Sequence, residues 1–277
     1  MNRTALLKHA GSIWLHTPAL WIVTLIGILV QAVASYALRE PSIGVGIFQT
    51  VLAFIVTAFT SGALISLVNS AASEERASIG AGLQSGLRNL APLLFVSLTL
   101  AIPVWIALGL ATGSITDIIA SGLGQPNSLQ ISDLLNNLGG LLSIIGVVFV
   151  IAMLVHAISV GAERAIVIDG QAIVDAFKKS VLLLRTKFVD FITWGLILAA
   201  VILGLEMIVA LIFGQLINVP DIDRAVLGTI LITLNVIIGA VTTVLISTLW
   251  TLVYREWQHP AIVEAAPDKK RESKKKG

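Results

Sequence analysis

The sequence lacks cysteine and has few charged residues. The absence of cysteine from 277 residues excludes disulfides, thiolate metal ligands and cysteine nucleophiles. Only 12% of the residues are charged, whereas 56% are hydrophobic. A soluble domain carries roughly twice that charge, about 25%. Such a chain cannot cover an aqueous surface with polar groups, so we expect most of its exterior to face lipid.

Recognisable catalytic motifs are also absent from the sequence. It contains no phosphate-binding loop, dinucleotide-binding fingerprint or nucleophile elbow. Its four histidines lack the spacing that would pair two ligands on one helix face, and they are His9, His16, His156 and His259. We therefore predict no catalytic residues, no metal site, no cofactor and no nucleic-acid partner. The sequence favours a non-enzymatic protein without deciding the point.

Long apolar segments dominate the chain. A transmembrane helix needs about 20 mainly apolar residues. Six segments qualify, and they are Ala19–Leu38, Gly46–Ser70, Ala91–Thr112, Leu138–Gly161, Phe188–Phe213 and Ala225–Tyr254. The sequence therefore predicts an all-α fold, a polytopic membrane bundle of six transmembrane helices, with the first acting as an uncleaved anchor.

Basic residues are distributed unevenly between the predicted spans. With the N-terminus inside, sixteen of the 18 Lys and Arg residues fall on the inner side, and only Arg39 and Arg224 lie outside. This asymmetry predicts a multi-pass protein of the cell (plasma) membrane with both termini in the cytoplasm. We expect residues 1–257 to form one integral membrane domain. Residues 258–277 have too few apolar side chains to fold, which predicts a disordered basic cytoplasmic tail.

The segment Asp169–Lys187 separates two apolar runs and has the pattern of an amphipathic helix. Its apolar stripe repeats at helical spacing through Ile173, Phe177, Val181 and Leu184. A helix of this kind lies in the membrane surface, here on the cytoplasmic side. Its basic residues are candidate contacts to anionic lipid, and they are Lys178, Lys179, Arg185 and Lys187. The alternative is that these residues only fix the topology.

The spacing of this stripe recurs in two earlier segments. The same pattern occurs 94 positions upstream at Ile79, Leu83, Leu87 and Leu90, and a weaker copy 73 positions further upstream at Leu6, Ala10, Trp14 and Thr17. Each copy precedes a pair of predicted spans, which indicates a possible threefold repeat. General amphipathicity would give the same spacing. Glycines 80, 82 and 86 predict that the middle copy is the weakest helix.

The predicted outer segment Ser114–Gly140 contains a Pro126-Asn127 turn between two short apolar repeats. One interpretation is a pair of short amphipathic helices on the outer surface. The other is a re-entrant cap over a cavity.

Glu206 is the single acidic residue deep within a predicted span. An intramembrane carboxylate is costly and is a functional candidate for that reason. We expect it to face the fourth or sixth span near Asn235 or Thr233, which lie at a comparable depth and can form hydrogen bonds. The alternative is that the carboxylate reaches the outer headgroups.

The segment ERAIVIDGQAIVDAFKKSVLLLRTKFVDFITWGLIL resembles the hallmark of a loose superfamily of multi-pass bacterial and archaeal proteins. Its pattern of an acidic residue, a helix and a span is matched here by Ala176, Phe177, Ser180 and Leu183, and the closing Tyr254-Arg255 is also similar. The superfamily includes the membrane domain sometimes fused to glycerophosphoryl diester phosphodiesterases. This sequence contains no phosphodiesterase domain, so the resemblance implies a fold and no activity.

The sequence is compatible with three functions. The first is a non-enzymatic protein of the cell envelope that interacts with membrane lipids, anionic ones included, or with a membrane-protein partner. The second is a transporter or channel with a path near Glu206. The third is a lipid-processing membrane enzyme, which only the phosphodiesterase association indicates.

The distribution of basic residues makes the topology testable. Reporter fusions placed after Gly124 should report an external location, whereas fusions after Gly170 and Lys276 should report the cytoplasm. An external signal at Lys276 would reverse the predicted orientation.

Overall fold

The computed structural model describes residues 3–37, 43–123, 131–217 and 224–258, and the described residues are helical apart from short connections. Within these ranges the helices are α1 (Arg3–His16), α2 (Pro18–Ala37), α3 (Ile43–Ala72), α4 (Ile79–Arg88), α5 (Leu90–Leu123), α6 (Ile131–Val167), α7 (Ile173–Thr186), α8 (Phe188–Ile217) and α9 (Arg224–Gln258). The all-α class is therefore confirmed. The predicted tail lies almost wholly in residues 259–277, outside the described ranges.

Five helices are individually long and apolar enough to cross a membrane. The qualifying segments are Gly44–Ala72, Leu90–Thr112, Leu142–Val167, Phe188–Gln215 and Val226–Gln258. The first predicted span, now α2, qualifies only together with α1, from which it is bent by 72°. Pro18 begins α2 at this bend, a position where its missing N–H costs no helical hydrogen bond. The protein is thus a multi-pass membrane protein with five or six spans.

The outer segment Ser114–Gly140 differs from both interpretations of the sequence. α5 continues as one helix to Leu123, and α6 begins at Ile131, while residues 124–130 lie outside the described ranges. The apolar repeats on each side of the turn therefore extend the two spans. Neither separate surface helices nor a re-entrant cap forms in the described part of this segment, because the helical pattern runs on without a break.

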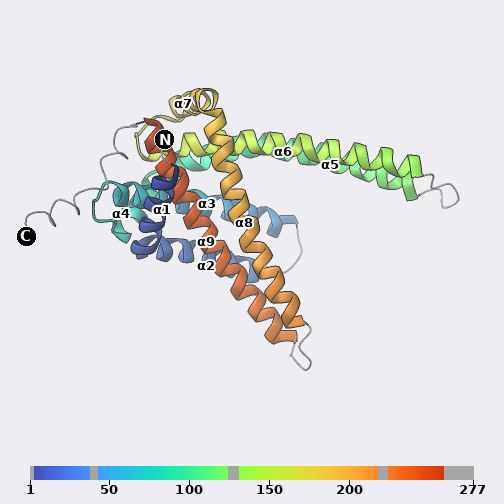
Figure 1. The fold of residues 1–277 in the computed structure, drawn as a ribbon, viewed down its shortest axis with the longest axis horizontal. Helices are drawn as coiled ribbons and strands as arrows, with labels where there is room; N and C mark the ends of the chain where they lie inside the picture. The colour runs from blue at the N-terminus through green and yellow to red at the C-terminus, as the bar shows by residue number, and fades with distance from the viewer. Residues whose placement is uncertain (1–2, 38–42, 124–130, 218–223, 259–277) are drawn as a thin grey trace, which may run out of the picture.

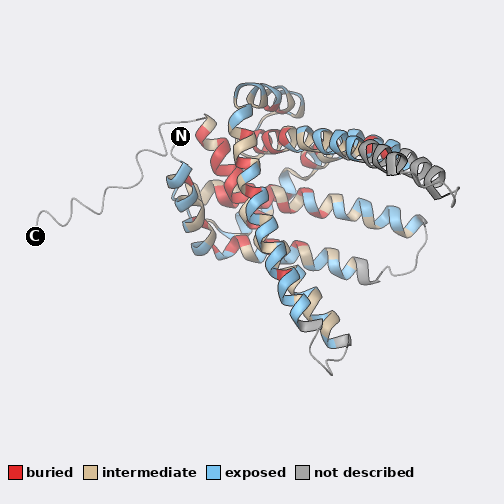
Figure 2. Cartoon of the chain, turned by 45° about the vertical axis from the view of Figure 1, so that its right-hand side comes forward, coloured by how far each residue is buried: buried red, intermediate tan, exposed pale blue. Residues whose placement is uncertain are grey.

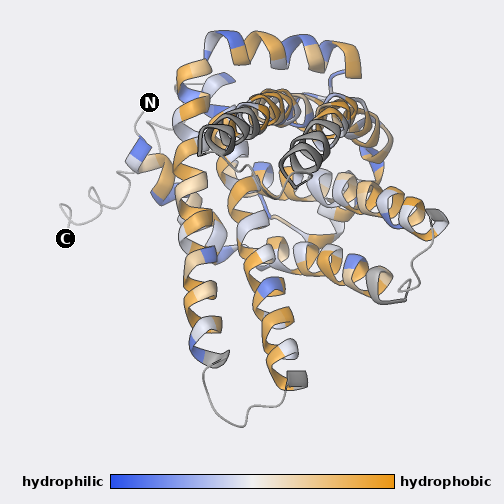
Figure 3. Cartoon of the chain, turned by 90° about the vertical axis from the view of Figure 1, so that its right-hand side faces the viewer, coloured by the Kyte–Doolittle hydropathy of each residue, from blue (hydrophilic) through white to orange (hydrophobic). Residues whose placement is uncertain are grey.

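The long helices form three hairpins that leave a common base in different directions (Figure 1), and they are α2–α3, α5–α6 and α8–α9. Buried residues gather at the base, and the outer halves of the α2–α3 and α8–α9 hairpins are mainly exposed or intermediate where they are described (Figure 2). Trp194 and Trp250 are among the large side chains buried in the base. The long helices are mostly apolar along their described lengths (Figure 3), as expected where lipid replaces water.

The short helices pack at this base, each against a long one. α4 packs on α3, α7 on α6 and α1 on α9. The side chain of Ser78 caps the start of α4 by accepting a hydrogen bond from the Ala81 N–H. A Cβ on Gly82 or Gly86 would lie only 2.7 Å from Leu67 Cγ or from the Phe59 carbonyl oxygen, respectively. The glycines that weaken α4 as an isolated helix therefore allow it to approach α3 closely.

The side of α7 that faces the bundle is centred on Ala176 and Ser180, which are both buried. Ile173 and Phe177 flank this side, whereas Val181 is 51% exposed and faces away from the bundle. The contact face is thus rotated relative to the predicted stripe. Small side chains lie at its centre because they bring the two helix backbones together, as the close contact of Ser180 with Gly161 of α6 demonstrates.

Gly161→Ala should destabilise the protein, because the new Cβ would lie 2.3 Å from Ser180 Oγ and 3.1 Å from Ser180 Cα. Overpacking of this kind costs about 1–3 kcal/mol of unfolding free energy. Gly146→Ala is the matched control on the same helix, since a Cβ there meets nothing within 4 Å. Thermal unfolding in detergent would measure both, and equal effects would exclude the close α6–α7 contact.

Candidate functional site

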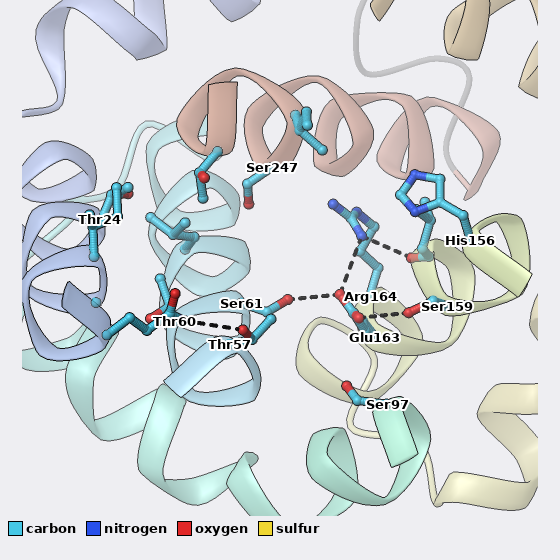
Figure 4. A pocket seen from close by; sticks show the side chains of 17 residues that line it. Thr24, Thr57, Thr60, Ser61, Ser97, His156, Ser159, Glu163, Arg164 and Ser247 are labelled. Atoms are coloured by element: carbon cyan, nitrogen blue, oxygen red, sulfur yellow. Dashed lines mark hydrogen bonds and ion pairs between the residues drawn. The ribbon is translucent and has the colours of Figure 1, made fainter. Parts of the chain in front are cut away.

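A polar cavity of about 340 Å³ lies inside the helix bundle (Figure 4). Side chains from α2, α3, α5, α6 and α9 line it, and most of the polar ones are hydroxyls. The polar and ionisable lining residues are Thr24, Gln31, Thr57, Thr60, Ser61, Ser97, His156, Ser159, Glu163, Arg164, Thr243 and Ser247. The cavity thus concentrates hydrogen-bonding groups within otherwise apolar helices.

Glu163 is the acidic residue of this cavity, and two serines hold its carboxylate. Ser61 Oγ of α3 donates a hydrogen bond to Glu163 Oε2, and Ser159 Oγ of α6 donates one to Oε1, both at 2.7 Å. Each carboxylate oxygen therefore has a hydroxyl partner, and the Glu163 side chain is only 18% exposed. These hydrogen bonds compensate a charge that would otherwise be costly inside a membrane helix.

Arg164, the next residue, is 3% exposed and places its guanidinium between α6 and α9. Its Nη1 donates a hydrogen bond to the Val160 carbonyl oxygen at 3.0 Å and lies 3.9 Å from Glu163 Oε2. Its Nε is buried without a hydrogen-bond partner in the structure. The adjacent acidic and basic residues form an ion pair whose formal charges cancel, yet the guanidinium still has donors to offer.

Two hydroxyls of the cavity also lack partners. Thr60 Oγ1 on α3 and Ser247 Oγ on α9 are buried without a hydrogen bond in the structure. Buried hydroxyls are normally paired, because an unmet one costs about 1–3 kcal/mol. Because both oxygen atoms are buried behind the cavity surface, a polar guest would reach them only after their side chains rotate toward it.

The sequence contained a signal for this site that our interpretation did not use. Glu163 and Arg164 are adjacent charges with apolar residues on both sides, in the run AISVGAERAIVI. Arg164 was counted only among the inner basic residues. The site depends on the fold, which places Ser61, 102 positions away, against Glu163.

A second polar cluster joins α7 to α9 at the base of the bundle. Lys179 Nζ lies 2.8 Å from Asp169 Oδ2, and the Tyr254 hydroxyl donates a hydrogen bond to the same oxygen. The Lys179 ammonium also lies 5.6 Å from the centre of the Tyr254 ring. Gly170 follows Asp169 with a φ of +64°, a left-handed conformation that glycine adopts without strain and that turns the chain toward α7. The cluster therefore fixes the start of α7.

The remaining hallmark residues also have structural roles at the base. Ser180 Oγ donates a hydrogen bond to the Ile158 carbonyl oxygen of α6 at 2.6 Å. Arg255 of α9 binds α3 through the Asn69 carbonyl oxygen at 2.7 Å and Ser73 Oγ at 2.8 Å. Next to this region, a cavity of about 640 Å³ lies between α4 and the loop that contains Asp169.

The three residues of the predicted intramembrane site lie on α8 and α9. Glu206 of α8 is exposed. The hydroxyl of Thr233 donates to the Thr229 carbonyl oxygen, and the amide of Asn235 donates to the Leu231 carbonyl oxygen, both within α9. These contacts leave both placements of Glu206 as predictions, the one near Asn235 or Thr233 and the one that reaches the outer headgroups.

The four candidate lipid contacts on α7 have different surroundings. Lys178 is exposed and lies 3.7 Å from the exposed carboxylate of Asp175, and Arg185 is also exposed. Lys187 is half-buried at the end of the helix. Lys179 instead turns toward Asp169. Among the residues that the structure describes, no cluster of three or more histidine or acidic side chains could hold a metal ion.

Comparison with known proteins places the chain in a family. A family model described as a domain of unknown function, DUF7847, matches residues 1–257. This range contains the cavity, the Asp169 cluster and every described helix except the last residue of α9. No curated protein and no solved structure matches the chain.

The Asp169 cluster predicts unequal effects for two adjacent lysines. Lys179→Gln should lower the unfolding free energy by about 1–3 kcal/mol, because Asp169 would lose a close charged partner. Lys178→Gln should change it by no more than about 0.5 kcal/mol, because that ion pair is exposed. Thermal unfolding in detergent compares the two variants, and an equal response would contradict a stabilising role for the cluster.

Proposed function

We propose that this chain, which belongs to the DUF7847 family, is a non-enzymatic multi-pass protein of the cell membrane that works by interacting with membrane lipids. The observation that carries the proposal is the exposed edge of α7. A membrane-protein partner that binds the same edge is the neighbouring possibility, and it predicts no lipid preference.

α7 presents apolar and basic side chains together on its exposed side. Val174 is 63% exposed and Leu182 is 60% exposed, and both lie outside the contact with α6. The exposed Lys178 and Arg185 share the helix with them. A helix with such edges is stable where its apolar side chains enter the acyl region and its basic ones meet phosphate. Lys179 is held by Asp169, which leaves Lys178, Arg185 and Lys187 for the headgroups.

The proposal places α7 on the cytoplasmic side of the plasma membrane, with both termini in the cytoplasm. It is supported by the sixteen of 18 basic residues that fall on that side, including those of the 258–277 tail. Residues 1–257 would then be one membrane domain, an extent that coincides with the family match.

We also propose that the fold is a threefold repeat of a short helix and two spans. The units would be α1–α3, α4–α6 and α7–α9. Support comes from the packing of the short helices, since α4 packs on α3, α7 on α6 and α1 on α9. Each short helix therefore contacts the last helix of another unit. α4 and α7 contact the unit before them in the chain, and α1 contacts the third unit, so the three units form a ring.

A distant relationship to the superfamily of phosphodiesterase-fused membrane domains is part of the proposal. It is supported by the contacts of the hallmark residues, since Ser180 binds α6 and Tyr254 binds Asp169. Residues that hold a shared fold together are expected to persist when activity differs.

Transport is the second candidate function, and the Glu163–Arg164 cavity favours it. Ionisable residues that face the interior of a membrane bundle often mark a substrate or proton path. This cavity lies between α2, α3, α5, α6 and α9 and offers a candidate path besides the one near Glu206. A lipid-processing enzyme is the third candidate. A serine nucleophile needs a base, and the carboxylate of Glu163 accepts hydrogen bonds from Ser61 and Ser159. This contact is the observation in favour of that function.

Lipid selectivity tests the proposed function. Spin-labelled phosphatidylglycerol should associate with the reconstituted protein more strongly than spin-labelled phosphatidylcholine. Replacing Lys178, Arg185 and Lys187 with Gln should reduce this preference by up to about fivefold per residue, since a basic residue near the surface contributes about 1 kcal/mol.

The matched control replaces Lys274, Lys275 and Lys276 of the tail with Gln. If α7 carries the interaction, this control should lose less selectivity than the α7 variant. An α7 variant with unchanged selectivity would exclude α7 as the lipid-binding element.

A further inference from the structure

The cavity inside the bundle combines unmet hydrogen-bond donors from three helices. They are Arg164 Nε of α6, Thr60 Oγ1 of α3 and Ser247 Oγ of α9, all buried and all without a partner in the structure. All three residues line the same cavity (Figure 4). An Nε–H group can only donate, and hydroxyls can donate as well as accept. A guest that binds Arg164 Nε must therefore present an acceptor, and acceptor oxygens would also satisfy both hydroxyls.

The charged pair of the cavity also has more unused donors than unused acceptors. Both carboxylate oxygens of Glu163 already accept a serine hydroxyl at 2.7 Å. The guanidinium of Arg164 donates to one carbonyl oxygen at 3.0 Å, and its distance of 3.9 Å to Glu163 exceeds hydrogen-bonding range. Glu163 thus has a hydrogen bond at each carboxylate oxygen, whereas Arg164 keeps donors to spare. The unfilled capacity of the site lies on its positive side.

We propose that this cavity binds an anionic oxygen group, a phosphate or a carboxylate, with Arg164 as the charged partner and Thr60 and Ser247 as hydroxyl donors. The group could belong to a lipid headgroup that enters from the bilayer or to a small soluble anion. About 340 Å³ is enough for either. This site is separate from the exposed edge of α7, so it goes beyond surface contact with lipid.

Glu163 gives the proposal a sharp consequence. A bound anion would lie close to the Glu163 carboxylate, and two like charges in a site of low dielectric repel each other. The titratable residues that line the cavity are His156, Glu163 and Arg164. Neutralising Glu163 should therefore strengthen anion binding, while neutralising Arg164 should weaken it. A cation site would show the reverse order, and two merely structural residues would both weaken binding.

The experiment measures two probes on the full-length protein in detergent. Native mass spectrometry follows phosphatidylglycerol, with phosphatidylcholine as the neutral reference, and isothermal titration follows inorganic phosphate. Arg164→Gln should reduce the affinity for the bound probe by about tenfold or more, the loss expected for a charged hydrogen bond. Glu163→Gln should raise it. Arg88→Gln is the matched control, because Arg88 is an exposed residue of α4 that does not line this cavity.

Two further variants keep the test informative if Arg164→Gln does not fold. Thr60→Val and Ser247→Ala remove one donor each with little change in volume, and each should weaken binding by several-fold. Selectivity for phosphatidylglycerol that Arg164→Gln removes, without phosphate binding, identifies a lipid headgroup as the source, and phosphate binding identifies a soluble anion. Selectivity that only the α7 variant removes belongs to the surface of α7. The proposal is overturned if neither probe binds, if the hydroxyl variants bind normally, or if Glu163→Gln weakens binding.

Discussion

The fold depends on the free-energy cost of placing charged side chains within apolar helices, and the Glu163–Arg164 pair is the main example. A carboxylate and a guanidinium inside apolar helices are tolerated only if each finds compensation nearby. Glu163 obtains it from Ser61 of α3 and Ser159 of α6, at 2.7 Å each. Because Ser61 and Glu163 lie on different hairpins, this hydrogen bond requires α3 and α6 to meet at a fixed height. The polar interior thereby determines how the hairpins come together at the base.

The base also depends on residues without bulky side chains. Gly86 brings α4 onto α3, and Gly161 brings α7 onto α6 at Ser180. Hydrophobic attraction between helices is weak in lipid, so close backbone contact and hydrogen bonds must supply the association. The described outer parts of the α2–α3 and α8–α9 hairpins are mainly exposed or intermediate. Lipid, which is as apolar as their side chains, is a sufficient environment for them.

The length of the apolar runs was enough to predict the long helices, because a run such as Phe188–Phe213 has no other stable conformation in lipid. The hallmark segment led to Ser180 and Tyr254, which have clear contacts in the structure. Glu206 is a candidate because it is an isolated charge in an apolar span. A single charge does not determine whether its side of the helix faces the bundle or the lipid. The adjacent charges of Glu163 and Arg164 are visible in the sequence. The pairing of Glu163 with Ser61 is not, because the two residues are 102 positions apart and no local pattern encodes that contact.

α6 connects the two candidate sites because they lie on different sides of it. Ile158 and Gly161 face α7, where the Ile158 carbonyl oxygen accepts from Ser180 and Gly161 touches the same serine. Ser159 and Glu163, four positions apart, face the cavity. Positions on one helix keep fixed angles to each other, so a rotation of α6 that serves one side must break contacts on the other. The contact with α7 and the hydrogen bonds of Glu163 therefore constrain the same rotation of α6.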